Sequence, residues 1–142
     1  MKEFKHFPAL LQDGTKAFLT VVSGPVIIEK GKVLLVKHGS DNFWKFPGGA
    51  HRTDDSFEQG AIREVKEELG IEVEFQGDPL MIVIERDHKG KHEYVVLCHY
   101  LAKRKGDIKP WRDIEEWAWH DVKKLSKGFA PNIRPAVEYF LK

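Results

Sequence analysis

The sequence predicts an α/β (α+β) fold in which helices pack on a mixed β-sheet. Runs of β-branched and aliphatic residues at 18–28 and 32–37 precede a helical pattern at 56–69, and further strand-like runs follow it. A second helical segment, at 131–141, closes the chain. This order is expected of a sheet covered by helices. A length of 142 residues with 42% hydrophobic content suits one domain over residues 1–142.

The first two strands are expected to form a hairpin, because Gly31 lies in a polar turn between them. Residues 39–46 form a polar and aromatic connection that ends in a Pro47, Gly48 and Gly49 turn. Glycines allow backbone angles and close approaches that a side chain would forbid. The backbone of this turn can therefore face a ligand.

The segment 56–69 is expected to be the main helix, with Ser56 as its N-cap and Gly70 as its stop. Its apolar positions recur at helical spacing and are Phe57, Ala61, Ile62, Val65 and Leu69. Glutamates occupy the opposite face.

Strands are expected again in the second half of the chain, at 71–75, 80–85 and 92–101. Turn signals at 76–79 and 87–90 separate them, and the last two can form a long hairpin. After a charged loop at 103–110, residues 116–119 read as a brief strand before the closing helix.

The charge balance and the cysteine count limit the classes of function. Basic and acidic residues number 23 and 22, so no overall basic field exists to gather nucleic acid, and DNA is not expected as a partner. No stretch approaches the ~20 apolar residues that span a bilayer, and no membrane partner is expected. The single cysteine, Cys98, lies in an apolar run and is expected to be a buried thiol. A cytoplasmic protein fits these features.

Three carboxylates carry the functional signal of the sequence. Glu64, Glu67 and Glu68 stand at i, i+3 and i+4, so they project from one helical face and repel one another. A hard divalent cation removes this conflict, because Mg²⁺, or Mn²⁺ in its place, takes carboxylate, water and phosphate oxygens as ligands. The alternative reading is a solvated acidic face.

The segment from Gly49 to Ile71 resembles the Nudix box, G-x5-E-x7-R-E-U-x-E-E-x-G-U, where U is aliphatic. Eight of its nine defined positions match, at Gly49, Arg63, Glu64, Val65, Glu67, Glu68, Gly70 and Ile71. The ninth departs from the pattern, because Asp55 stands where the family has its first glutamate. The resemblance implies a Nudix α/β/α sandwich over nearly the whole chain.

The resemblance also implies an activity, namely Mg²⁺-dependent hydrolysis of a diphosphate bond in a nucleoside diphosphate linked to another moiety. Glu64 and Glu68 would be the principal metal ligands, Glu67 a further one, and the Gly48 carbonyl would complete the shell. Arg63 would orient the loop through Asp55, and Arg63, Asp55 and Gly49 would support the site structurally. The substrate would be a small nucleotide derivative of unspecified identity, and a homodimer stays open.

The general base is less defined, because family members use either a box glutamate or a glutamate from a later loop. Glu116 is favoured as a further ligand or base, against a reading of Glu115 and Glu116 as solvated charges. Lys37 and His38, at the end of a strand, are candidates for binding phosphate, against a reading of the lysine as an edge charge. Trp44 is a candidate for stacking on a base, against a reading as a core aromatic, and His51 for approaching the phosphates. The other histidines considered, His88, His92, His99 and His120, are expected to be surface or core residues.

Two other functions fit the same pattern. The domain could bind a nucleotide without cleaving it and act as a sensor, although all three box glutamates are present. Prenyl diphosphate isomerase chemistry occurs in the same fold superfamily, but it normally uses a cysteine near the site, and Cys98 is expected inside a strand.

Overall fold

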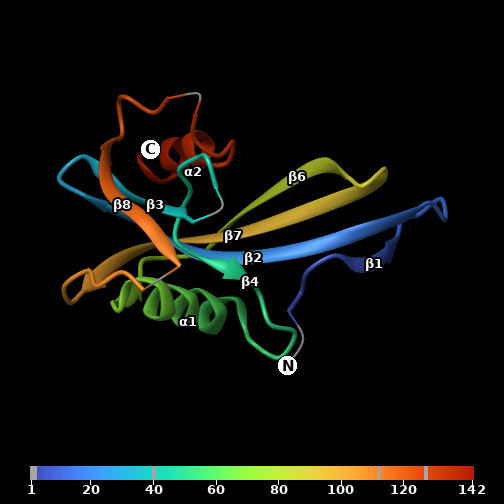
Figure 1. Ribbon diagram of the computed structural model, residues 1–142, viewed down its shortest axis with the longest axis horizontal. Coiled ribbons are helices and arrows are strands. Elements are labelled where there is room, and N and C mark those ends of the chain that lie inside the picture. Colours follow the sequence, from blue (N-terminus) through green and yellow to red (C-terminus); the bar gives the residue numbers. More distant parts are fainter. Residues whose placement is uncertain (1–2, 40, 112, 127) are drawn as a thin grey trace.

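A computed structural model describes residues 3–39, 41–111, 113–126 and 128–142, with the side chain of His88 left out of the description. Within these residues the strands are β1 (Phe7–Leu10), β2 (Lys16–Glu29), β3 (Lys32–His38), β4 (Gly49–Ala50), β5 (Glu72–Phe75), β6 (Leu80–His88), β7 (Lys91–Lys105) and β8 (Ile114–Asp121). The helices are α1 (Phe57–Leu69) and α2 (Ile133–Phe140). Figure 1 shows α1 on one side of the sheet and α2 on the other.

The sheet is mixed, with the order β5-β7-β2-β3-β8. Its centre is a parallel ladder between β2 and β7 that runs from the pair Phe18 and Glu93 to the pair Ile27 and Ala102. β2 also pairs antiparallel with β1 and β4, and β7 with β5 and β6. β3 pairs with β2 only beside the connecting turn and then with β8 along its length. The predicted mixed sheet with helices packed on it is confirmed.

Local sequence explains both ends of α1. The Ser56 side chain accepts a hydrogen bond from the Gln59 backbone N–H, and the Gln59 side chain accepts one from the Ser56 N–H. Gly70 ends the helix in the left-handed conformation, with φ of 67°. The predicted helix and both caps are confirmed. The apolar stripe was only partly right, because Phe57 and Ile62 are 37% and 40% exposed.

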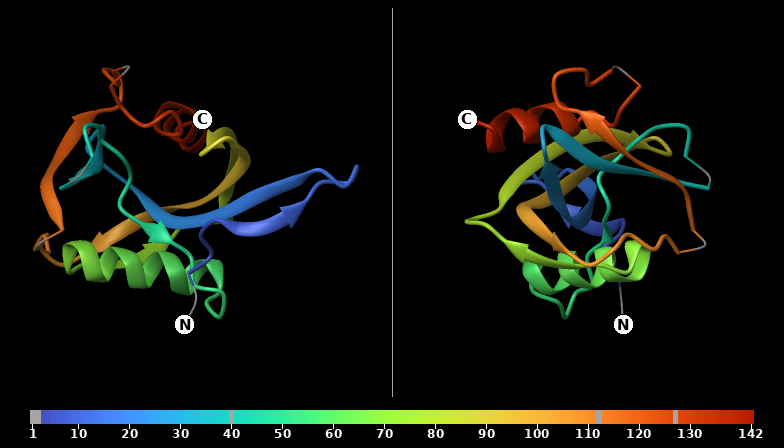
Figure 2. Two further views of the ribbon diagram at one scale, coloured as in Figure 1. Left: turned by 45° about the vertical axis from the view of Figure 1, so that its right-hand side comes forward. Right: turned by 90° about the vertical axis from the view of Figure 1, so that its left-hand side faces the viewer.

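The hydrophobic core lies on both faces of the sheet, and the alternation of β3 divides it. Val33 and Leu35 pack on the α2 side in a cluster that includes Ile133. Leu34 and Val36 point to the α1 side and pack with Val65 and Leu69. Fully burying one such side chain is worth about 1.5–3 kcal/mol, so β3 ties both helices to the sheet. Figure 2 shows this layering from two further directions.

Several predicted boundaries were wrong because strand pairing, rather than local composition, decides where a strand begins and ends. β1 was not predicted, and it exists because it pairs with the start of β2. The expected loop at 103–110 begins late, because Lys103 to Lys105 continue β7 alongside β5, where Lys105 lies 3.4 Å from Glu74. The strand predicted at 116–119 extends over Ile114–Asp121. The turn predicted at 87–90 is shorter, because β6 continues to His88, which pairs with Lys91.

Cys98 is fully buried, as predicted, and burial raises the pKa of its thiol to about 11. In the part of the chain that the structure describes, no helix is long and apolar enough to cross a membrane.

Candidate functional site

The three box glutamates line one cleft of roughly 920 Å³. α1 supplies one wall of this cleft, and the Gly48 and Gly49 turn supplies another. Lys66 of α1 and Ala50 beside the turn also line the cleft, and three other parts of the chain contribute the rest: Glu3 and Lys5, His38 and Lys45, and Trp111, Asp113 and Ile114. The fold therefore gathers the carboxylates and several cations around one space.

The two glycines of the turn are required by close packing. Gly48 has φ of 144°, and a Cβ at this position would lie 2.4 Å from the Ser23 carbonyl oxygen of β2. A Cβ at Gly49 would lie 2.6 Å from Oε2 of Glu64. The turn is thus pressed between the sheet and a box carboxylate, which brings its peptide groups to the edge of the cleft.

Arg63 links the loop before α1 to the carboxylates. Its Nη1 lies 2.9 Å from Oε1 of Glu64, and its Nε donates to Oδ2 of Asp55 at 3.1 Å. Nη2 lies 3.0 Å from the same Asp55 oxygen. The contact between Asp55 and Arg63 that the resemblance implies is therefore present, but both Arg63 nitrogens, Nε and Nη2, contact the same oxygen of the shorter carboxylate.

The environment of Glu64 disfavours its charge. Burial raises the pKa of this carboxyl, Arg63 opposes that effect, and the neighbouring Glu68 and Glu67 raise the pKa further. The net shift is upward. Such a shift indicates a group whose charge needs a further positive partner.

Glu68 has partners on two sides. Its Oε1 accepts a hydrogen bond from the Gly48 N–H at 2.7 Å, and its Oε2 pairs with Nε2 of His38. His38 in turn lies 3.7 Å from Asp41, which pairs with Lys45 at 2.6 Å. The sequence offered one signal for the contact with His38, because this residue continues the α1-facing alternation of β3.

The box carboxylates offer the oxygen ligands that a hard divalent cation prefers, but their side chains are not yet arranged around one metal position. No three His, Cys, Asp or Glu side chains among the described residues already surround a common metal position. The donors nevertheless are all oxygens, they line one cleft, and their mutual repulsion adds to the raised pKa of Glu64. Glu67 is 54% exposed, and among the residues that the structure describes its ion-pair partners are Arg63 at 3.6 Å and Arg52 at 3.9 Å.

Lys37, Trp44 and Glu116 gather away from this cleft. Lys37 lies 3.6 Å from Glu116, its Cα partner across β3 and β8, and 5.1 Å above the ring of Trp44. Alternation along β3 places Lys37 with Val33 and Leu35, on the α2 side. None of the three lines the cleft of the box glutamates.

His51 is buried under the start of α1 and does not line the cleft. Its Nε2 donates to the Asp55 carbonyl at 2.7 Å, and its Nδ1 lies 3.2 Å from the Ser23 hydroxyl. A Cβ on Gly60 would approach the ring to 2.7 Å. The ring therefore supports the loop that carries Asp55.

His92, His99 and His120 occupy the surface or core environments expected of them. His99 is buried, donates from Nδ1 to the Gly24 carbonyl at 3.1 Å and accepts at Nε2 from Asn132 at 2.9 Å. His120 is partly buried and lies edge-on to Trp44. His92 is exposed, and the side chain of His88 lies outside the description.

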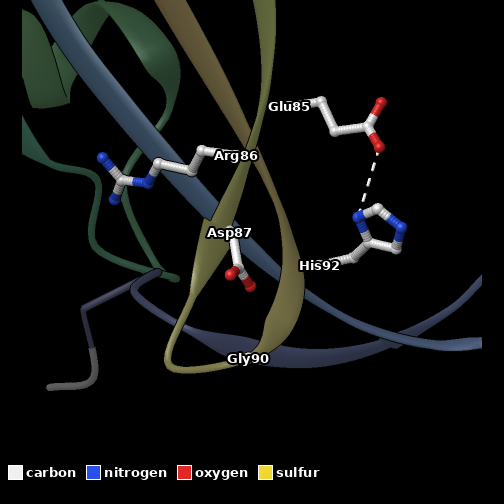
Figure 3. A pocket seen from close by; sticks show the side chains of 5 residues that line it. All are labelled: Glu85, Arg86, Asp87, Gly90 and His92. Carbon is white, nitrogen blue, oxygen red and sulfur yellow. Dashed lines mark ion pairs between the residues drawn. The ribbon is translucent and has the colours of Figure 1, made fainter.

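A second hollow lies at the hairpin of β6 and β7 (Figure 3). Glu85, Arg86, Asp87, Gly90 and His92 line it, and a single ion pair of 3.2 Å joins Glu85 to His92. No box residue reaches this hollow, which separates it from the carboxylate cleft.

Two cleft residues that sequence reasoning missed are Lys5 and Trp111. The Trp111 side chain is 59% exposed, and its backbone N–H donates to the Glu68 carbonyl at 2.8 Å, which fixes this segment against the end of α1. Neither residue belongs to a motif, and both reach the cleft through long-range folding.

Comparisons with known proteins agree with the resemblance. A family profile described as NUDIX domain matches residues 18–140. A MutT-like protein from Streptomyces ambofaciens is 36% identical over 77 residues, which cover 54% of this chain and 49% of the relative. The m7GpppN-mRNA hydrolase of Saccharomyces cerevisiae is 34% identical over 112 residues, which cover 78% of this chain and 11% of the relative. This chain therefore spans less than half the length of these two relatives.

The fold also matches a solved structure. The crystal structure of a MutT NUDIX hydrolase from Burkholderia pseudomallei has a TM-score of 0.68 to this chain at 26% sequence identity. The match covers 84% of this chain and 96% of that one.

Proposed function

This chain belongs to the NUDIX domain family, and on that premise we propose that it is a Mg²⁺-dependent pyrophosphohydrolase. The proposed substrate is a nucleoside diphosphate linked to another moiety, cleaved within the diphosphate bridge. The observation that carries the proposal is the cleft in which Glu64, Glu67 and Glu68 face the Gly48 and Gly49 turn.

In this proposal Glu64 and Glu68 hold the metal, Glu67 contributes a further oxygen, and the Gly48 carbonyl stays a candidate ligand. A bound Mg²⁺ or Mn²⁺ supplies positive charge for phosphoryl oxygens and lowers the pKa of a water molecule. Arg63 and His38 hold Glu64 and Glu68 in place through the contacts described above. The raised pKa of Glu64 supports this assignment, because a cation would favour the charged carboxylate.

The acceptor of the water proton is proposed to be Glu67. Glu67 lines the cleft and has weaker partners than the other two box glutamates. Glu116 gains no support for this role, since its carboxylate pairs with Lys37 on the other face of β3 and β8. Lys37 and Trp44 are likewise assigned no contact with the diphosphate, and His51 supports the loop rather than the substrate.

A test combines Mg²⁺ with a panel of nucleotide derivatives and identifies the products by chromatography. The panel includes a capped dinucleotide, because the yeast relative is an mRNA hydrolase, together with ADP-ribose, a dinucleoside polyphosphate and NADH. In oxygen-18 water the label should appear on a phosphate product. Label in the sugar, or no Mg²⁺-dependent product from any compound, would contradict the proposal.

Binding without cleavage is the second candidate function. It is favoured by one observation, namely that the side chains of His38 and Arg63 already contact the carboxylates of Glu68 and Glu64. In that case the same panel would show saturable binding but no products. An isomerase role for Cys98 has no such support, because the thiol is fully buried and its pKa is raised.

A further inference from the structure

We infer that Lys5 binds substrate phosphate in the cleft, and that buried Glu93 is a positioning residue that anchors the segment carrying it. This inference rests on the proposed function, because it names a further contact in the same site. Residues 3–6, called the N-terminal strap below, pass the loop that enters α1, as Figures 1 and 2 show for this end of the chain.

The backbone of the strap is hydrogen-bonded to the walls of the site. The Phe4 N–H donates to the His51 carbonyl at 2.5 Å, and the Val21 N–H donates to the Phe4 carbonyl at 2.8 Å. The backbones of Glu3 and Arg52 form an isolated antiparallel β-bridge. Phe4 therefore lies between β2 and the loop that leads to α1, and the next residue, Lys5, lines the cleft.

A buried carboxylate fastens the other end of the strap. The side chain of Glu93 on β7 is 0% exposed, and it receives Nε of Arg86 at 2.6 Å and Nδ1 of His6. The His6 N–H also donates to the Thr20 hydroxyl at 3.0 Å. A buried carboxylate that lost a partner would be strongly penalised, so these contacts fix His6 on the sheet.

The conformation of His6 supports an anchoring role. Its φ is 53°, in the left-handed region that residues other than glycine rarely adopt. Such a backbone persists where surrounding contacts hold it. The contacts with Glu93 and Thr20 supply that constraint one residue after Lys5.

Among the described residues that line the cleft, Lys5 is the lysine for which no carboxylate partner is found. Lys45 pairs with Asp41 at 2.6 Å, and Lys66 lies 3.8 Å from Glu72. No ion pair of Lys5 occurs among the residues that the structure describes. A metal held by glutamates covers part of a diphosphate, and the remaining phosphate charge needs a cation. Lysine acts as a compact point charge for phosphate.

The experiment measures binding of α,β-methylene-ADP, a diphosphate that resists hydrolysis, by titration calorimetry in the presence of Mg²⁺. Lys5→Gln should weaken binding about tenfold, which corresponds to about 1.4 kcal/mol. Lys5→Arg should keep most of the affinity. Lys16→Gln, at an exposed lysine that starts β2 outside the cleft, should leave it unchanged. Equal affinities for Lys5→Gln and Lys16→Gln would overturn the role of Lys5.

The anchor is tested by a double-mutant cycle, using His6→Ala because Glu93→Gln could prevent folding. His6→Ala should weaken binding about fivefold in the native chain and by less than about twofold in the Lys5→Gln background. The same loss in both backgrounds would overturn positioning through Lys5. If the native chain binds the probe but hydrolyses no panel compound, the proposed hydrolysis is contradicted and the role of Lys5 in phosphate binding still stands. A native chain that hydrolyses a panel compound but does not bind the probe would overturn this inference and keep the proposed activity.

Discussion

Replacing Glu64 by glutamine is expected to change the response to Mg²⁺ far more than the stability of the metal-free protein. The burial of Glu64 raises its pKa, and Arg63 only partly offsets this. A carboxyl whose pKa rises on folding stabilises the fold at pH values below its ordinary pKa and loses that contribution as pH rises through the raised value. At pH 7 the charge is therefore unfavourable, and Glu64→Gln should be at least as stable as the native chain without metal.

The effect of Mg²⁺ can be estimated from ligand linkage. A ligand that binds only the folded state at a hundred times its Kd adds about 2.7 kcal/mol. For a chain of this size each kcal/mol raises Tm by roughly 2–4 °C, so the native protein should gain about 5–10 °C. Glu64→Gln should lose most of this gain, and its turnover should fall at least about a hundredfold, or about 2.7 kcal/mol at the barrier.

Thermal unfolding followed by circular dichroism, with and without Mg²⁺ at pH 7, measures the first effect, and product formation measures the second. Glu138→Gln is the matched control, because Glu138 is an exposed residue of α2, on the other side of the sheet. An equal Mg²⁺ shift in Glu64→Gln and in the control would refute the ligand assignment.

Three further outcomes are expected. Asp55→Glu should raise the apparent Mg²⁺ affinity or the turnover a few fold, because in the native chain both Arg63 contacts end on one Asp55 oxygen and a longer carboxylate can offer two. Equal kinetics for Asp55→Glu and Asp55→Ala would show that the pair with Arg63 is not used. Glu116→Gln should change the rate at each pH, and the Mg²⁺ concentration needed for half-maximal activity, by less than about twofold. A flattened acidic limb of the pH–rate profile would instead show that Glu116 acts as the general base. Because burial lowers the pKa of His99 to about 4, the unfolded chain takes up a proton between pH 6.5 and 4 that the folded chain excludes. As the pH falls through that window, the free energy of unfolding measured in urea should fall by up to about 3 kcal/mol in the native chain but not in His99→Gln. The same dependence of stability on pH in both proteins would contradict the lowered pKa of His99.

The helix and the carboxylates were predictable because their signals are local. The caps of α1 and the spacing of Glu64, Glu67 and Glu68 lie within one continuous segment, where helical geometry alone decides which side chains meet. The exposed Phe57 and Ile62 show the limit of this reasoning, because periodicity does not reveal where the neighbouring strands stop covering a helix.

The rest of the site depends on contacts between distant segments. Lys5 lies in the cleft between two neighbours that distant segments hold: Phe4 is bonded to the backbone of His51, and His6 contacts Glu93. Conversely, Lys37 and Glu116 were expected near the carboxylates, although the alternation of β3 and β8 places them on the other face. Strand alternation is a local property, but which face meets α1 is decided by tertiary packing.

The parallel ladder between β2 and β7 has a consequence for how the protein forms during synthesis. Phe18 pairs with Glu93, so the central ladder cannot close until most of the chain has left the ribosome. Contacts so distant in sequence carry a loop-closure cost and slow folding. The segment of α1 is made between these two strands, and its three glutamates repel one another before the sheet exists to hold them. The nascent chain is therefore expected to complete the cleft of the box glutamates only after β7 has paired with β2.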